Sequence, residues 1–155
     1  MITNYKQFNE GVLDHLIGPT EEDVLNNMKD VSANDILNKS VVDNFILGVK
    51  YALKKGCFYN QTFRTALKLA IETNKLEIAE MILNDANIRF TIEVINDSLT
   101  FIVKKPVYYD MVKLLLEYIP SIEDKDELIK SAEAKGNVEI AKLLKKNIKV
   151  YDKEI

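Results

Sequence analysis

Apolar residues recur at intervals of three and four along most of the chain, a spacing that places them on one face of an α-helix. The segments at residues 48–53, 65–71 and 76–83 show this pattern most clearly. Alternation of apolar and polar residues over the length of a strand is scarce, and its best case, residues 89–94, is short. The pattern predicts an all-α protein.

The amphipathic segments come in pairs, and the pairs repeat along the chain. A short polar break separates the two members of each pair, and the second members align when they begin at residues 48, 78, 111 and 140. One helical pair cannot bury both of its faces, but stacked neighbours share a continuous core. The sequence therefore predicts a solenoid of about four helix-turn-helix repeats. The first members of the pairs lie at residues 34–42, 65–72, 91–103 and 125–135.

Several residues mark the expected ends of these helices. Ser32 followed by Asp35 resembles a capping box at a helix start. Gly56, Gly136 and Pro120 stand where helices should stop.

Four segments resemble the ankyrin-repeat family. Thr65-Ala-Leu-Lys-Leu-Ala70 resembles the family's T-P-L-H-x-A signature, with alanine for proline and lysine for histidine. Residues 74–83, 136–144 and 49–56, the last including its terminal glycine, resemble the family's second helix. The resemblance extends over residues 33–148 as four degenerate repeats. The Asp-Gly hairpin tips of the family are absent, and the third repeat carries Pro106 and an inserted turn. The resemblance implies an ankyrin-like solenoid that binds proteins. Tetratricopeptide and HEAT arrays are alternatives, but a tetratricopeptide unit has 34 residues and a HEAT unit is longer.

The ends of the chain do not fit the repeat. We interpret residues 1–32 as an N-terminal helical cap for the stack, residues 33–150 as one continuous ankyrin-like domain, and residues 151–155 as a tail. The segment at residues 5–10 resembles the short leader of proteins packaged in tailed-phage heads, which is processed after a glutamate. With residues 17–22, it is also similar to the opening of small phage and giant-virus ankyrin proteins.

Composition and charge narrow the function classes. The 155 residues are 47% hydrophobic and 29% charged, which fits one folded domain with a core. The net charge of -3 disfavours nucleic acid as a partner. No apolar run approaches the ~20 residues of a spanning helix, and no signal peptide opens the chain, so we expect no membrane association. The expected location is the cytoplasm, or the host cytoplasm or virion if the protein is viral.

Residues suited to catalysis are few. His15 is the only histidine, Cys57 is the only cysteine, and the five glycines form no phosphate-binding loop. We interpret the acidic clusters at residues 21–23 and 123–127 as helix starts, where carboxylates complement the helix dipole. The sequence predicts no catalytic residue, no metal and no cofactor, and therefore not an enzyme. A carboxylate-dependent hydrolase would need acidic side chains converging on one cleft.

One segment is unusual for a repeat loop. Phe58-Tyr-Asn-Gln-Thr-Phe-Arg64 carries three aromatic residues and an arginine, and the only two arginines, Arg64 and Arg89, each precede a predicted first helix. Aromatic residues and arginine are enriched at interfaces. The alternative is that Phe58 and Phe63 pack the loop onto the core and the arginines are solvated. The predicted partner-binding residues are Phe58, Tyr59, Asn60, Arg64 and Arg89.

The function expected from these features is non-enzymatic protein–protein interaction through a concave face and loops. A concrete version is a phage or viral protein that binds and blocks a host protein. The alternative is a virion-packaged or self-assembling structural component. The sequence names neither the partner nor the oligomeric state.

Overall fold

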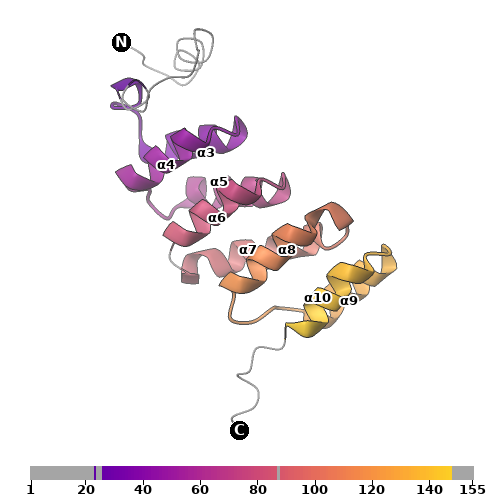
Figure 1. Ribbon diagram of the computed structural model, residues 1–155. Helices are drawn as coiled ribbons and strands as arrows, with labels where there is room; N and C mark the ends of the chain where they lie inside the picture. Colours follow the sequence, from indigo (N-terminus) through magenta and orange to yellow (C-terminus); the bar gives the residue numbers. More distant parts are fainter. Residues whose placement is uncertain (1–22, 24–25, 87, 148–155) are drawn as a thin grey trace. The chain divides into compact units, whose positions relative to one another are not determined.

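A computed structural model of the protein describes residues 23, 26–86 and 88–147, with the side chains at 88–90 excepted. The described residues form eight α-helices and one short 3-10 helix, and they contain no strand (Figure 1). The prediction of an all-α protein is confirmed for this part of the chain. The helices are α3 (Ala33–Val42), α4 (Ile46–Lys55), α5 (Gln61–Glu72), α6 (Leu76–Asp85), α7 (Ile88–Ile102), η1 (Pro106–Tyr108), α8 (Tyr109–Tyr118), α9 (Lys125–Ala134) and α10 (Val138–Lys146).

Several predictions concern the ends of the chain. The leader at 5–10, His15, nearly all of the predicted cap at 1–32 and the tail at 151–155 lie outside the described residues. The assignment of 33–150 to one repeat domain stays a prediction.

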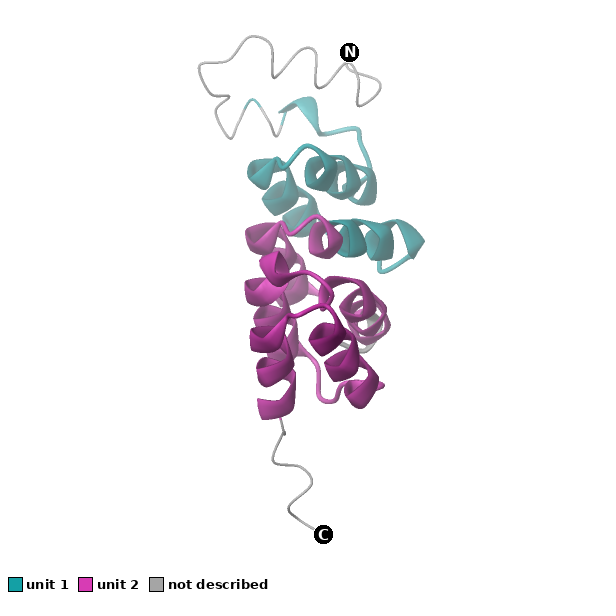
Figure 2. Cartoon of the chain, turned by 90° about the vertical axis from the view of Figure 1, so that its right-hand side faces the viewer, with its two compact units in different colours: residues 1–69 teal, residues 70–155 magenta. Residues whose placement is uncertain are grey.

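The chain forms two compact units, residues 1–69 and 70–155 (Figure 2). The described part of unit 1 holds α3, α4 and the first part of α5. Unit 2 holds the rest of α5 and the helices from α6 to α10. Within unit 2, α8 packs against α6, α7 and α10, and α9 packs against α10.

The turns inside three helical pairs are the same. In each, the second turn residue has a left-handed backbone: Asn44 (φ 55°), Asn74 (φ 57°) and Gly136 (φ 75°). Asparagine and glycine tolerate this conformation best, which explains why they stand there. The N–H of the next residue reaches back to a carbonyl five residues earlier, which is the Schellman end of a helix. These bonds join Phe45 to Ser40 at 2.8 Å, Lys75 to Ala70 at 2.9 Å and Asn137 to Ala132 at 2.9 Å.

The connection between α7 and α8 departs from this pattern. It is the extended turn, residues 103–108, and it contains η1, which begins at Pro106. A proline suits this first position because it has no N–H to leave unpaired. The irregularity predicted for the third repeat is therefore present.

Each unit has its own apolar core. In unit 1 the pair of α3 and α4 is close-packed at Gly48, where an added Cβ would lie 2.2 Å from Ser40 Oγ. In unit 2 the second helix of each pair contributes fully or almost fully buried aliphatic residues at the corresponding positions. These include Ile78, Ile82, Met111, Leu115, Ile140 and Leu144.

The helix starts and stops agree with most of the predicted signals. Ser32 Oγ accepts the N–H of Asp35 at 3.2 Å and begins α3. Gly56 ends α4 with φ 98°, and Pro120 follows the end of α8. The alternating segment at 89–94 is helical, as part of α7. No described helix has both the length and the apolar character needed to cross a bilayer.

Candidate protein-binding site

The predicted aromatic segment begins as a short loop between α4 and α5, residues 56–60. The side chain of Asn34 in α3 holds its backbone at Phe58. Asn34 Oδ1 accepts the N–H of Phe58 at 2.8 Å, and Asn34 Nδ2 donates to the Phe58 carbonyl at 2.7 Å. The same Nδ2 donates to Asn60 Oδ1 at 2.8 Å. Asn34 is 7% exposed, so these bonds satisfy an amide that would be costly to bury alone. We call this arrangement the Asn34 clamp.

The loop is shorter than the sequence predicted. Residues 58–64 were expected to form a loop, but α5 begins at Gln61. The reason is a cap: Asn60 Oδ1 accepts the N–H of Phe63 at 3.2 Å, and the Asn60 carbonyl accepts the N–H of Arg64 at 3.0 Å. The helix therefore starts one turn before the segment that resembles the ankyrin signature.

The two aromatic residues of the loop itself are exposed. The Phe58 side chain is 80% exposed and Tyr59 is 40% exposed, whereas Phe63 is fully buried. The Tyr59 ring packs edge-on against Phe63, with 5.1 Å between centroids and 74° between planes. The alternative that Phe58 and Phe63 both anchor the loop is thus right for Phe63 and wrong for Phe58. Phe58 and Tyr59 form an apolar surface on a fixed backbone.

The arginines do not precede their helices as predicted. Arg64 is the fourth residue of α5 and is half-buried. Arg89 is the second residue of α7 in unit 2, and its side chain lies outside the described ones. The structure thus brings Phe58, Tyr59, Asn60 and Arg64 together on the loop and the first turn of α5. It leaves Arg89 unplaced with respect to them.

The remaining chemistry-bearing residues that the structure describes have structural surroundings. Cys57 is half-buried and donates to the Ala52 carbonyl at 3.4 Å, as expected for a small residue between helix and loop. The acidic cluster at 123–127 opens α9, with Asp126 and Glu127 in its first turn. No group of three or more histidine, cysteine or acidic side chains suited to a metal ion occurs in the described parts of the chain.

Asn34 is the residue of the candidate site that the sequence did not reveal. It was recognised only as part of a helix, since a single asparagine near a helix start usually faces solvent or caps the backbone. Its partners lie 24 and 26 residues further along the chain, and no local pattern signals such contacts.

Comparison with protein-family models, with curated proteins and with solved structures finds no match for the chain. The site is therefore characterised by its geometry: an exposed aromatic pair on a loop whose backbone a buried amide holds in place.

Proposed function

We propose that the protein is a non-enzymatic protein-binding module and that unit 1 binds its partner through Phe58 and Tyr59. The observation that carries the proposal is the combination of an 80% exposed phenylalanine with a loop backbone held by the Asn34 clamp. Burying a phenylalanine side chain is favourable by about 2–3 kcal/mol. Because Phe58 is mostly exposed in the free protein, most of this free energy would be gained only when a partner covers the ring.

The clamp supports binding because it lowers the entropy cost of association. A flexible loop must be ordered when it binds, and each ordered group reduces the affinity. Here the Phe58 amide and carbonyl are already bonded, and Tyr59 rests on a buried ring. The side chains that a partner would cover are thus presented on a preorganised backbone.

The composition of the surface also suits an interface. Tyrosine and arginine are over-represented among residues that dominate binding energy. Tyr59 and the half-buried Arg64 both follow Phe58 in the chain, on the loop and in the first turn of α5. A partner with an apolar cavity for one aromatic ring, surrounded by hydrogen-bond acceptors, would match this surface.

The proposal can be tested by photo-crosslinking. Phe58 is replaced by p-benzoylphenylalanine, an aromatic side chain that crosslinks to whatever lies against it, and the protein is expressed in its source cells. Val42, also apolar and 52% exposed in unit 1, receives the same group as the matched control. We expect one discrete adduct with another protein from position 58 and none from position 42.

Two results would contradict the proposal. Identical adduct patterns from the two positions would mean that the loop has no specific partner. An adduct of two copies of this chain would instead favour the self-assembling alternative. A specific role as a phage or viral protein that blocks a host protein stays a prediction, and the identity of the adduct tests it.

A further inference from the structure

Unit 2 contains a pocket beside the extended turn. Its volume is about 510 Å³, and it lies between the extended turn and the start of α8 on one side and the start of α10 on the other. This volume lies within the range of about 300–1,000 Å³ that is typical of ligand-binding pockets. The lining residues are Pro106, Tyr109, Gly136, Asn137, Val138, Glu139 and Ile140.

The pocket is built by the irregularity of the third helical pair. The extended turn is held on both sides, since Asn137 Nδ2 donates to the Val103 carbonyl at 3.0 Å and Asn74 Nδ2 donates to the Val107 carbonyl at 3.2 Å. The Tyr108 hydroxyl donates to the Glu72 carbonyl. These bonds fix the turn, so the pocket does not need to form when a ligand arrives.

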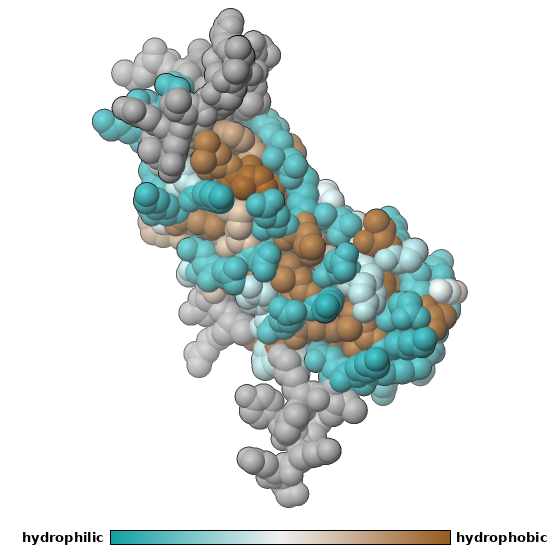
Figure 3. Space-filling model, in the orientation of Figure 1, coloured by the Kyte–Doolittle hydropathy of each residue, from teal (hydrophilic) through white to brown (hydrophobic). Residues whose placement is uncertain are grey.

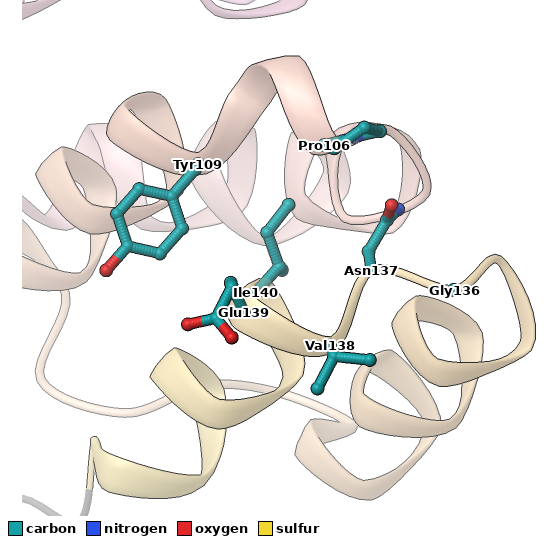
Figure 4. Close-up of a pocket in the computed structure, with 7 residues that line it drawn as sticks. All are labelled: Pro106, Tyr109, Gly136, Asn137, Val138, Glu139 and Ile140. Atoms are coloured by element: carbon teal, nitrogen blue, oxygen red, sulfur yellow. The ribbon is translucent and has the colours of Figure 1, made fainter.

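Its walls are mainly apolar and partly exposed. Figure 4 shows the Tyr109 ring on one side and Pro106 on the other, with Ile140 between them and the Glu139 carboxylate directed towards the Tyr109 side. Val138, which lines the pocket, is 54% exposed, and Val107, next to Pro106 in the chain, is 66% exposed. Figure 3 shows apolar side chains at the surface by the α7–α8 and α9–α10 turns, on the right of the view, with polar residues around them. An apolar group entering here would be removed from water on several sides.

The charge of the lining is negative. Glu139 is its only charged residue, and its side chain is 72% exposed. It forms an ion pair at 3.0 Å with Lys142 on the same helix, and such an exposed pair is worth little. The carboxylate therefore has lone pairs available for a second cation from a partner.

We propose that this pocket binds a segment of a partner protein that places one large aliphatic side chain next to a lysine or arginine. The aliphatic group would fill the space between Pro106, Tyr109 and Ile140, and the cation would lie against Glu139. This site belongs to unit 2 and goes beyond the Phe58 surface of unit 1.

The test uses the full chain, labelled with ¹⁵N, and four probes. The probes are N-acetyl-Ala-Leu-Arg-Ala-amide, the same peptide with glutamate for arginine, the same peptide with alanine for leucine, and cyclohexanol. We expect the first peptide to shift the amide signals of Gly136, Val138 and Ile140. It should bind about threefold more tightly than the glutamate peptide, the range of one exposed ion pair. The alanine peptide should bind about tenfold more weakly, because the leucine side chain supplies most of the burial.

Matched variants separate the two parts of the proposal. Glu139→Gln should abolish the preference for arginine over glutamate, and Val138→Ser should weaken both leucine peptides. Phe58→Ser should change neither the preference for arginine nor the affinity for the leucine peptides. A failure of the pocket proposal can therefore be distinguished from a failure of the proposal for unit 1.

Four results would overturn the inference. The first is the absence of shifts, and the second is equal affinity for the leucine and alanine peptides or for the arginine and glutamate peptides. The third is cyclohexanol binding as tightly as the first peptide, which would indicate a small-molecule pocket. The fourth is a shift of the same signals on concentrating the protein alone, which would indicate a second copy as the occupant.

Discussion

A buried asparagine of an earlier helix forms hydrogen bonds with the loop before α5, and another does so with the loop before α9. Only the first asparagine uses both the oxygen and the nitrogen of its side-chain amide. Asn34 uses both Oδ1 and Nδ2 to hold Phe58 and Asn60. Among the described residues, Asn96, equally buried at 7% exposed, accepts only the Glu123 N–H, at 3.3 Å, and its Nδ2 has no partner. The same residue type therefore gives one firmly held loop and one loosely held loop.

The residues that precede the two helices also differ in side-chain hydrogen bonding, and again the loop before α5 has more of it. Asn60 caps α5 with its side chain, whereas Asp124 has a left-handed backbone (φ 49°) and makes no side-chain cap bond to α9. The firmly held loop carries the exposed Phe58, and the loosely held loop carries no large exposed apolar residue. The loop with more side-chain hydrogen bonds thus carries the surface that we propose for binding, as preorganisation would require.

The largest difference is expected from removing the two asparagines. Asn34→Ala removes the acceptor of the Phe58 N–H, while the Phe58 carbonyl and Asn60 Oδ1 each lose one donor and keep another, the N–H groups of Asn60 and Phe63. The variant should therefore lower the free energy of unfolding by about 1–3 kcal/mol. Asn96→Ala removes one long bond and an unpaired amide, so its cost should stay within about 1 kcal/mol. Urea unfolding followed by circular dichroism measures both. Equal losses would mean that the two loops are held alike.

Glycine at the two pre-helix positions should give effects of opposite sign. Asn60→Gly removes the acceptor of Asn34 Nδ2 and of the Phe63 N–H, and should destabilise by about 1 kcal/mol. Asp124→Gly relieves a left-handed backbone at a residue with a Cβ, and should stabilise by about 0.5–1 kcal/mol. The same urea titrations apply, and two changes of the same sign would refute the contrast.

A pH contrast separates the asparagine clamp from the tyrosine that holds the extended turn. Burial, and then the nearby Glu72 carboxylate, raise the pKa of Tyr108 above its ordinary 10.0. A raised pKa favours the protonated phenol in the folded state, so its contribution is present below pH 10 and is lost as the pH rises through the folded pKa. Wild type should lose stability above about pH 10, and Tyr108→Phe should lose less. Asn34→Ala should keep the wild-type pH profile, since the clamp does not titrate. Identical profiles for wild type and Tyr108→Phe would contradict this.

The smallest effect on folding is expected at the exposed aromatic residue. Phe58→Ala should change the free energy of unfolding by less than about 0.5 kcal/mol, because the side chain contributes little to the core. The matched variant Phe63→Ala, only five residues away, should cost about 3–5 kcal/mol. A large loss from Phe58→Ala would show that this ring serves the fold rather than a partner.

The helices were predictable from sequence because their apolar spacing is local. All eight predicted amphipathic segments of the pairs correspond to observed helices, and Asn74, Gly136 and Gly56 stand at turns whose backbone favours them. The start of α5 was missed, since it depends on the Asn60 cap.

The geometry of the sites was less accessible to sequence reasoning. The Asn34 clamp joins residues 24 to 26 positions apart, and the pocket joins the extended turn to α10. The only local signal for the pocket was the irregular spacing at Pro106. Contacts of this kind become visible only when the helices are packed.

Hydrogen exchange at the Phe58 amide tests most directly whether the loop is held as described. This N–H lies outside any helix and is bonded only to the Asn34 side chain among the described contacts. We expect its exchange to be slowed at least ~100-fold relative to an unstructured peptide, and to accelerate at least ~10-fold in Asn34→Ala. In the wild type, the Glu123 amide should exchange faster than the Phe58 amide. Exchange of Phe58 at the unstructured rate, in wild type and variant alike, would contradict a preorganised binding loop.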